Sequence, residues 1–134
     1  MPALVLTKHS GSGQTVIAVL DDEDSVRKAL VRVLRAAGFT ANGFSCGEEF
    51  LESWHIDRPT CLLLDLQLPG LSGQEVHQAL ILAGAQFPII IITAHDGPDT
   101  REQCMRLGAV FYLRKPLEAD TLLQTVRSAV GAPG

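Results

Sequence analysis

The sequence predicts an α/β protein with a doubly wound parallel sheet of five strands and helices on both faces. Short apolar runs rich in β-branched residues alternate with segments whose apolar residues recur at helical spacing. Such alternation implies right-handed crossovers between parallel strands. Acidic and polar residues stand where several of the apolar runs end, and the carboxyl ends of parallel strands form the crevice in which open α/β sheets bind ligands.

The strands are predicted from apolar runs that polar or turn-forming residues bound. They span 16–20, 39–44, 61–64, 89–92 and 110–113. The run 61–64 is continuously apolar, which is typical of a strand covered by helices on both faces. The run 39–44 is the weakest, because Asn42 and Gly43 interrupt it.

The helices are predicted from apolar periodicity and from residues that begin helices. The periodic segments after the first, third, fourth and fifth strands span 26–37, 76–82, 99–107 and 122–130. Ser45 and Ser72 are each followed three residues later by a glutamate, Glu48 and Glu75, and this spacing predicts capping boxes for the second and third helices. The fourth helix has a thin apolar face.

Length and composition favour a single domain. With 134 residues, of which 46% are hydrophobic, the chain can bury a core without disulfides or a structural metal. We expect a flexible leader at 1–14, one folded domain at 15–131, and a tail or truncated linker at 132–134. The cysteines are odd in number and widely spaced, which favours free thiols in a reducing compartment over a disulfide framework.

Charge and hydropathy exclude two classes of partner. The net charge is −4 and the chain has no basic stripe, so we expect no nucleic-acid binding by this segment. No stretch reaches the roughly 18 apolar residues of a membrane span, and the N-terminus does not read as a signal peptide. We therefore expect a cytoplasmic protein without membrane contact.

Five polar residues mark the ends of the predicted strands: Asp21, Asp22, Asp65, Thr93 and Lys115. Three crowded carboxylates resist ionisation unless a positive charge lies among them, and Mg²⁺ prefers such oxygen ligands. With Mg²⁺ bound, Asp65 is a plausible nucleophile toward phosphorus, because carboxylates form acyl phosphates. Lys115 supplies a point charge and Thr93 a hydroxyl for a phosphoryl oxygen.

The segments IAVLDDEDSVR, LLLDLQLPGLSG, IIITAHD and FYLRKPL resemble those of response-regulator receiver domains, especially the FixJ type. The resemblance covers about residues 14–130 and includes all five polar residues in order. It implies a CheY-like sheet of strand order 2-1-3-4-5. It also implies a signalling protein that takes part in phosphorelay, promotes only its own phosphotransfer and dephosphorylation, and is not otherwise an enzyme.

The resemblance assigns the acceptor and the metal ligands. Asp65 would be the phosphoacceptor for a sensor histidine kinase. Asp21 or Asp22, together with Asp65 and the main-chain carbonyl of Gln67, would hold Mg²⁺, and Asp22 would be the more direct ligand of the acid pair.

The resemblance also assigns the switch. Thr93 would be the switch hydroxyl, Lys115 the cation that binds the phosphoryl group, and Tyr112 the switch aromatic. The bond from Lys115 to Pro116 would be cis, which only proline makes accessible. On phosphorylation, Thr93 and Tyr112 would move and bias the surface of the fourth helix and fifth strand, through which a homodimer is possible. A missing output domain could then regulate transcription.

Three alternatives belong to other functional classes. Flavodoxins share the sheet order, but their first loop must cradle an anionic phosphate, and here this loop is acidic. Phosphatases of the haloacid-dehalogenase type need a second acid two residues after the nucleophile, where this chain has Gln67. A degenerate receiver that only binds protein would lack one of the acids or the lysine. Tyr112 could also serve packing alone.

Overall fold

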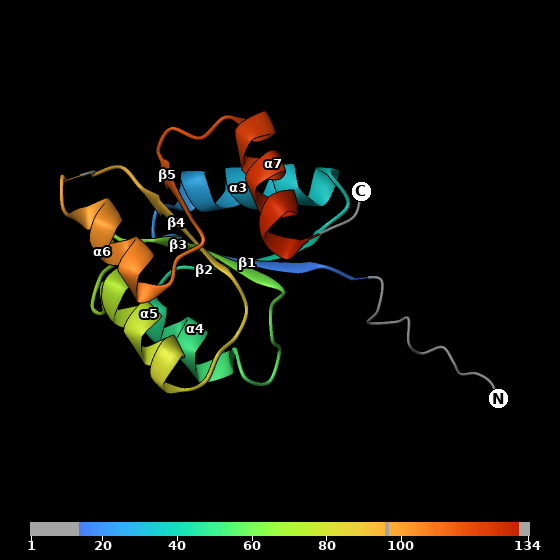
Figure 1. Cartoon of the computed structure of the whole chain (residues 1–134). Coiled ribbons are helices and arrows are strands. Elements are labelled where there is room, and N and C mark those ends of the chain that lie inside the picture. The colour runs from blue at the N-terminus through green and yellow to red at the C-terminus, as the bar shows by residue number, and fades with distance from the viewer. Residues whose placement is uncertain (1–13, 96, 132–134) are drawn as a thin grey trace.

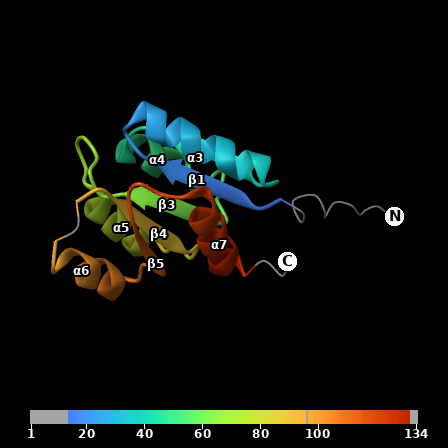
Figure 2. The same cartoon turned by 90° about the horizontal axis from the view of Figure 1, so that it is seen from above.

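The computed structural model describes residues 14–95 and 97–131. Its strands are β1 (Val16–Leu20), β2 (Thr40–Phe44), β3 (Cys61–Asp65), β4 (Ile89–Thr93) and β5 (Phe111–Arg114). Its helices are α3 (Asp24–Ala36), α4 (Gly47–Ser53), α5 (Gly73–Leu82), α6 (Thr100–Leu107) and α7 (Ala119–Val130). The strands pair in parallel in the order β2-β1-β3-β4-β5, which confirms the predicted fold and strand order. Figure 2 shows β3 between β1 and β4.

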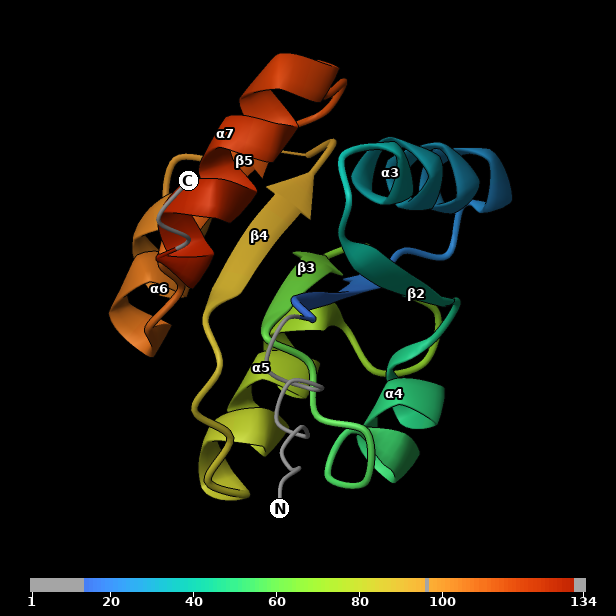
Figure 3. The same cartoon turned by 90° about the vertical axis from the view of Figure 1, so that its right-hand side faces the viewer.

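Two helical layers enclose the sheet, with α3 and α7 on one face and α4, α5 and α6 on the other (Figures 1 and 3). Strand β3 contributes alternate side chains to both layers: Leu62 and Leu64 pack with α4 and α5, while Cys61 and Leu63 pack with α3 and α7. This two-sided burial explains the continuous apolar run. Each fully buried leucine stabilises the fold by roughly 1.5–3 kcal/mol.

The two predicted capping boxes have different outcomes. The box of Ser72 and Glu75 is present at the start of α5. The box of Ser45 and Glu48 is wrong, because α4 begins one residue later than that box requires, with Cys46 at its N-cap and no side-chain cap. Glu48 instead accepts a hydrogen bond from the backbone N–H of Leu71 at 3.3 Å. The Ser45 N–H donates to Glu49 at 3.4 Å, one residue further on than the predicted box requires.

Strand register places the ends of β1, β3 and β4 at one edge of the sheet, as the sequence predicts. Leu20 pairs with Leu64, and Asp65 pairs with Ile92, so Asp21, Asp65 and Thr93 follow or end neighbouring strands. The predicted leader, apart from Gln14, and the predicted tail lie outside the described residues. Within the described ranges, every helix is too short or too polar to cross a membrane.

Candidate functional site

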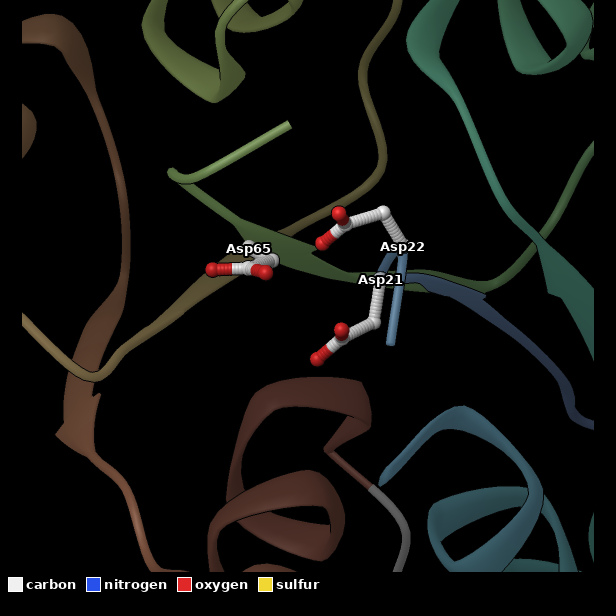
Figure 4. Close-up of side chains that lie close together, drawn as sticks. All are labelled: Asp21, Asp22 and Asp65. Atoms are coloured by element: carbon white, nitrogen blue, oxygen red, sulfur yellow. The ribbon is translucent and has the colours of Figure 1, made fainter. Parts of the chain in front are cut away.

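Three aspartates converge at the carboxyl edge of the sheet. Asp21 and Asp22 directly follow β1, and Asp65 is the last residue of β3. Carboxylate oxygens of the three lie within 4.8 Å of one another, and Figure 4 shows their side chains gathered at the ends of these two strands. Asp21 and Asp65 are buried, whereas Asp22 is exposed and lines a cleft. The crowding of carboxylates that the sequence predicts is therefore present.

Lys115 brings positive charge to this cluster. Its Nζ lies 2.8 Å from Asp21 Oδ2, 3.3 Å from Asp65 Oδ2 and 3.6 Å from Glu23 Oε1. The Lys115–Pro116 bond is cis, as expected. Burial lowers the pKa of the Lys115 ammonium, but its close contacts with the carboxylates of Asp21 and Asp65 outweigh burial, so the net pKa is raised. Lys115 is therefore a permanent cation in the site.

The Asp65 carboxyl is harder to ionise than an ordinary aspartate. Its pKa is raised from 3.8 to about 6, mainly by burial and additionally by the negative charge of Asp21. Two contacts oppose the rise: the backbone N–H of Gln67 donates to Asp65 Oδ1 at 3.1 Å, and the Lys115 ammonium lies nearby. Asp65 is thus largely ionised at neutral pH, but its ionisation lowers the free energy of unfolding of the metal-free protein.

This cost predicts that Asp65→Asn stabilises the metal-free protein at alkaline pH. A carboxyl whose folded pKa is raised contributes stability below pH 3.8, and this contribution is lost as pH rises through about 6. Because one pKa unit corresponds to about 1.4 kcal/mol, the variant should exceed wild type by about 2 to 3 kcal/mol at pH 8 and by little near pH 4. Urea unfolding in EDTA at pH 4 and pH 8 measures the difference in the free energy of unfolding between the variant and wild type. A difference that is the same at both pH values would contradict the raised pKa of Asp65.

The donor set fits a hard divalent cation. Asp21 Oδ2 is buried and accepts no hydrogen bond of normal geometry, although Lys115 Nζ lies 2.8 Å away as an ion partner. A buried carboxylate oxygen without a hydrogen bond is costly unless a cation satisfies it. The cluster offers carboxylate oxygens, which are the ligands that Mg²⁺ prefers. Gln67 lines the cleft beside these acids.

The cleft over the cluster has a volume of about 930 Å³ and lies between the loops that follow β3 and β4. Ala94 and His95 line it beside Asp22. The Thr93 hydroxyl donates to the His95 carbonyl at 3.0 Å and accepts from the His95 N–H at 3.1 Å. Thr93 is fully buried, so its hydroxyl is held by its own loop in this arrangement.

Tyr112 lies on the face of the sheet that α4, α5 and α6 cover. Its ring is buried in the core of that face, and the guanidinium carbon of Arg101 in α6 lies 5.7 Å from the ring centroid. Tyr112 therefore links β5 to α6 by packing. Its role as a switch stays a prediction.

Three residues near the site escaped the sequence reasoning. Glu23 contacts Lys115, and Arg27 donates to the main-chain carbonyl of Asp21 at 2.9 Å. Gly73 packs so closely against β3 that a Cβ there would lie 2.3 Å from the carbonyl oxygen of Asp65. Glu23 could have been suspected from the uninterrupted acidic block, but the other two contacts join segments whose proximity only the fold decides.

Comparison with known proteins agrees with this geometry. A family model described as response regulator receiver domain matches residues 17–127. The response regulator protein TodT of Pseudomonas putida is 32% identical over 123 residues, which cover 92% of this chain and 54% of TodT. The DNA-binding transcriptional regulator NtrC of Escherichia coli is 34% identical over 115 residues, covering 86% of this chain and 24% of NtrC.

A solved structure supports the same conclusion. The crystal structure of a response regulator receiver protein from Burkholderia phymatum is 40% identical and superimposes with a TM-score of 0.78, covering 88% of this chain and 96% of that one. The chain spans about half the length of TodT, with 54% covered. The similarity therefore concerns the receiver portion of such longer relatives.

Proposed function

The chain belongs to the response-regulator receiver domain family, and from this premise we propose that Asp65 accepts a phosphoryl group from the phosphohistidine of a sensor histidine kinase. The convergence of three carboxylates within 4.8 Å, with Lys115 Nζ 3.3 Å from Asp65, carries the proposal. Phosphoryl transfer requires mainly positioning and charge stabilisation, and this cluster supplies both. The protein is then a signalling receiver that promotes only its own phosphorylation and dephosphorylation.

The proposed transfer proceeds by displacement at phosphorus. A carboxylate oxygen of Asp65 attacks, the phosphorus–nitrogen bond to the kinase histidine breaks, and the imidazole leaves and takes up a proton. The product is an acyl phosphate on Asp65. Water later attacks its phosphorus, the phosphorus–oxygen bond to Asp65 breaks, and inorganic phosphate leaves.

Asp21, Asp22, Asp65 and the main-chain carbonyl of Gln67 would hold Mg²⁺, with Asp22 as the more direct ligand of the acid pair. When bound, Mg²⁺ neutralises the charge that the phosphoryl group adds to the cluster. Asp22 suits this role because it is exposed to the cleft, where a cation that keeps several waters has room. Lys115 would shift from its carboxylate partners to a phosphoryl oxygen.

Intact mass spectrometry tests the acceptor. We expect wild type to gain a phosphate-sized adduct when incubated with acetyl phosphate and Mg²⁺, and to gain none in EDTA. Asp65→Asn should gain none, because an amide oxygen is a poor nucleophile. Asp57→Asn, which removes one exposed charge at the opposite edge of the sheet, should behave like wild type. An adduct on both wild type and Asp65→Asn would show that Asp65 is not the acceptor.

We propose that phosphorylation is transmitted through Thr93, Tyr112 and α6. The Thr93 hydroxyl would leave the His95 carbonyl for the phosphoryl oxygen, and Tyr112 would adjust with it. Helix α6 suits a mobile role, since Cys104 is its one buried residue and Arg101 packs on Tyr112. The surface of α6 and β5 would then join two copies.

Beryllofluoride, a mimic of the phosphoryl group, tests this switch. With Mg²⁺ present, it should shift the amide resonances of α6 and β5 and move the protein toward a dimer in analytical ultracentrifugation. Asp65→Asn should show neither change. Resonances and mass that stay constant in wild type under saturating beryllofluoride would contradict the switch while leaving the acceptor assignment intact.

The relatives support a proposal for the cellular role. NtrC is named a DNA-binding transcriptional regulator, and we infer that this receiver likewise controls transcription, in the cytoplasm, through an output domain. The net charge of this chain is −4, so DNA contact would fall to that other domain.

A further inference from the structure

The side chain of Arg27 packs on the backbone of Gly43 next to Asp21 and Asp22. We propose that Arg27 is a positioning residue for Mg²⁺: by holding the main-chain carbonyl of Asp21 it sets the direction of Asp22, and Gly43 provides the space through which the arginine reaches it. This inference rests on the proposed function, because it concerns the same metal.

The path of Arg27 is defined by three contacts. From the first turn of α3 its side chain crosses the end of β2, where a Cβ on Gly43 would lie 3.0 Å from Arg27 Cδ and 3.1 Å from Cγ. Its Nη1 donates to the Asp21 carbonyl at 2.9 Å, and its Nη2 pairs with Asp24. The side chain is 15% exposed, so the stem is largely buried.

The carbonyl that Arg27 holds belongs to the peptide unit between Asp21 and Asp22. On its other side, the Asp21 N–H donates to the Phe44 carbonyl in β2 at 3.1 Å. The main chain is thus fixed both before and after the Asp21 side chain. Since a peptide unit is planar, fixing its carbonyl also restricts the backbone of the next residue, and with it the direction of the Asp22 side chain.

Asp22 needs this support more than Asp21 does. The Asp21 carboxylate is buried, accepts a hydrogen bond from the Glu23 N–H at 2.9 Å and lies against Lys115. Asp22 is exposed, so its direction depends chiefly on its backbone. When a group that orients a metal ligand without touching the metal is removed, the affinity for the metal typically falls by about 10- to 100-fold.

Gly43 gives an independent way to displace the arginine. Its φ lies outside the left-handed region, so a larger residue introduces no backbone strain, and valine is favoured in strands. The three heavy atoms nearest to a Cβ at this position all belong to the flexible side chain of Arg27. Gly43→Val should therefore act on the site through Arg27, and it should act only while Arg27 is present.

Calorimetric titration with Mg²⁺ of Arg27→Met, Gly43→Val and the double variant tests the proposal. Arg27→Met should bind Mg²⁺ about tenfold more weakly than wild type, and Gly43→Val should weaken binding in the same direction. The double variant should bind no more weakly than Arg27→Met alone. Arg27→Lys, with one ammonium in place of a planar fork, should fall between wild type and Arg27→Met.

Controls separate positioning from folding and from charge. Asp24→Asn removes the other partner of the guanidinium and should leave Mg²⁺ affinity within about twofold of wild type, since the Asp21 contact remains. All titrations are run below the melting transition that each variant shows in EDTA. If Arg27→Met does not fold, the Mg²⁺ affinities of Gly43→Val and Arg27→Lys still test whether Arg27 positions Asp22.

The outcomes are distinct from those for the proposed function. Wild-type Mg²⁺ affinity in both Arg27→Met and Gly43→Val, or additive losses in the double variant, would overturn the positioning role even where wild type forms the acyl phosphate. A wild type that binds Mg²⁺ but forms no adduct would overturn the proposed function and leave the role of Arg27 standing.

Discussion

Asp22→Asn is expected to slow phosphorylation of Asp65 severely at low Mg²⁺ concentration without unfolding the protein. The substitution removes an anionic ligand that faces the cleft, and we expect Mg²⁺ affinity to fall on the order of 100-fold. It also removes one charge from a cluster whose oxygens lie within 4.8 Å, so repulsion in the metal-free protein decreases. Calorimetry with Mg²⁺ and the rate of adduct formation with acetyl phosphate measure both effects.

The matched control for this variant is Asp57→Asn. It removes the same charge from an exposed residue that precedes β3, at the opposite end of that strand from Asp65. It should leave both the Mg²⁺ affinity and the rate of adduct formation near the wild-type values. Thermal unfolding in EDTA should show Asp22→Asn at least as stable as wild type. Normal phosphorylation by Asp22→Asn at low Mg²⁺ would mean that Asp21 and Asp65 suffice for the metal, and that Asp22 is not its ligand.

Gly73→Ala is expected to damage both the fold and the phosphorylation site. A Cβ at this position would lie 2.3 Å from the Asp65 carbonyl oxygen and 2.7 Å from the Leu66 Cα. Both neighbours are backbone atoms, so either α5 or the end of β3 must move. We expect a loss of about 3 kcal/mol or more in the free energy of unfolding, at the upper end for overpacked sites, together with slowed phosphorylation because Asp65 moves.

Ser72→Ala, one residue earlier, serves as the control for Gly73→Ala. It removes the Ser72 hydroxyl from the capping box of α5 and should lower the free energy of unfolding by about 1 kcal/mol while phosphorylation remains normal. Urea unfolding and adduct formation are measured for both variants. Equal stability of the two would show that the helix shifts readily and that this close approach places no constraint on Asp65.

Much of the architecture could be predicted from local pattern. The strand 61–64 was recognisable because residues facing both helical layers must be apolar, and the structure extends that strand to include Asp65. The capping box of Ser72 formed because α5 begins where the sequence predicts, so Ser72 and Glu75 stand at the N-cap and N3 positions. That of Ser45 did not form: the Ser45 N–H donates to Glu49, one residue further on, and Glu48 accepts from Leu71, which is 23 residues away in the chain. The spacing rule failed where the helix begins one residue later than the sequence predicts.

The sequence by itself determined the class of the sheet and the polar residues at its carboxyl edge, because the periodicity of apolar residues decides which side chains must be buried. It also placed Asp65 among other acids. Only the tertiary structure decided that Asp21 and Asp65 are buried, that Lys115 Nζ contacts both of them, and that the side chain of Arg27 passes over Gly43. These contacts depend on how the helices pack against the sheet. The spacing of residues along the chain does not predict the individual distances in that packing.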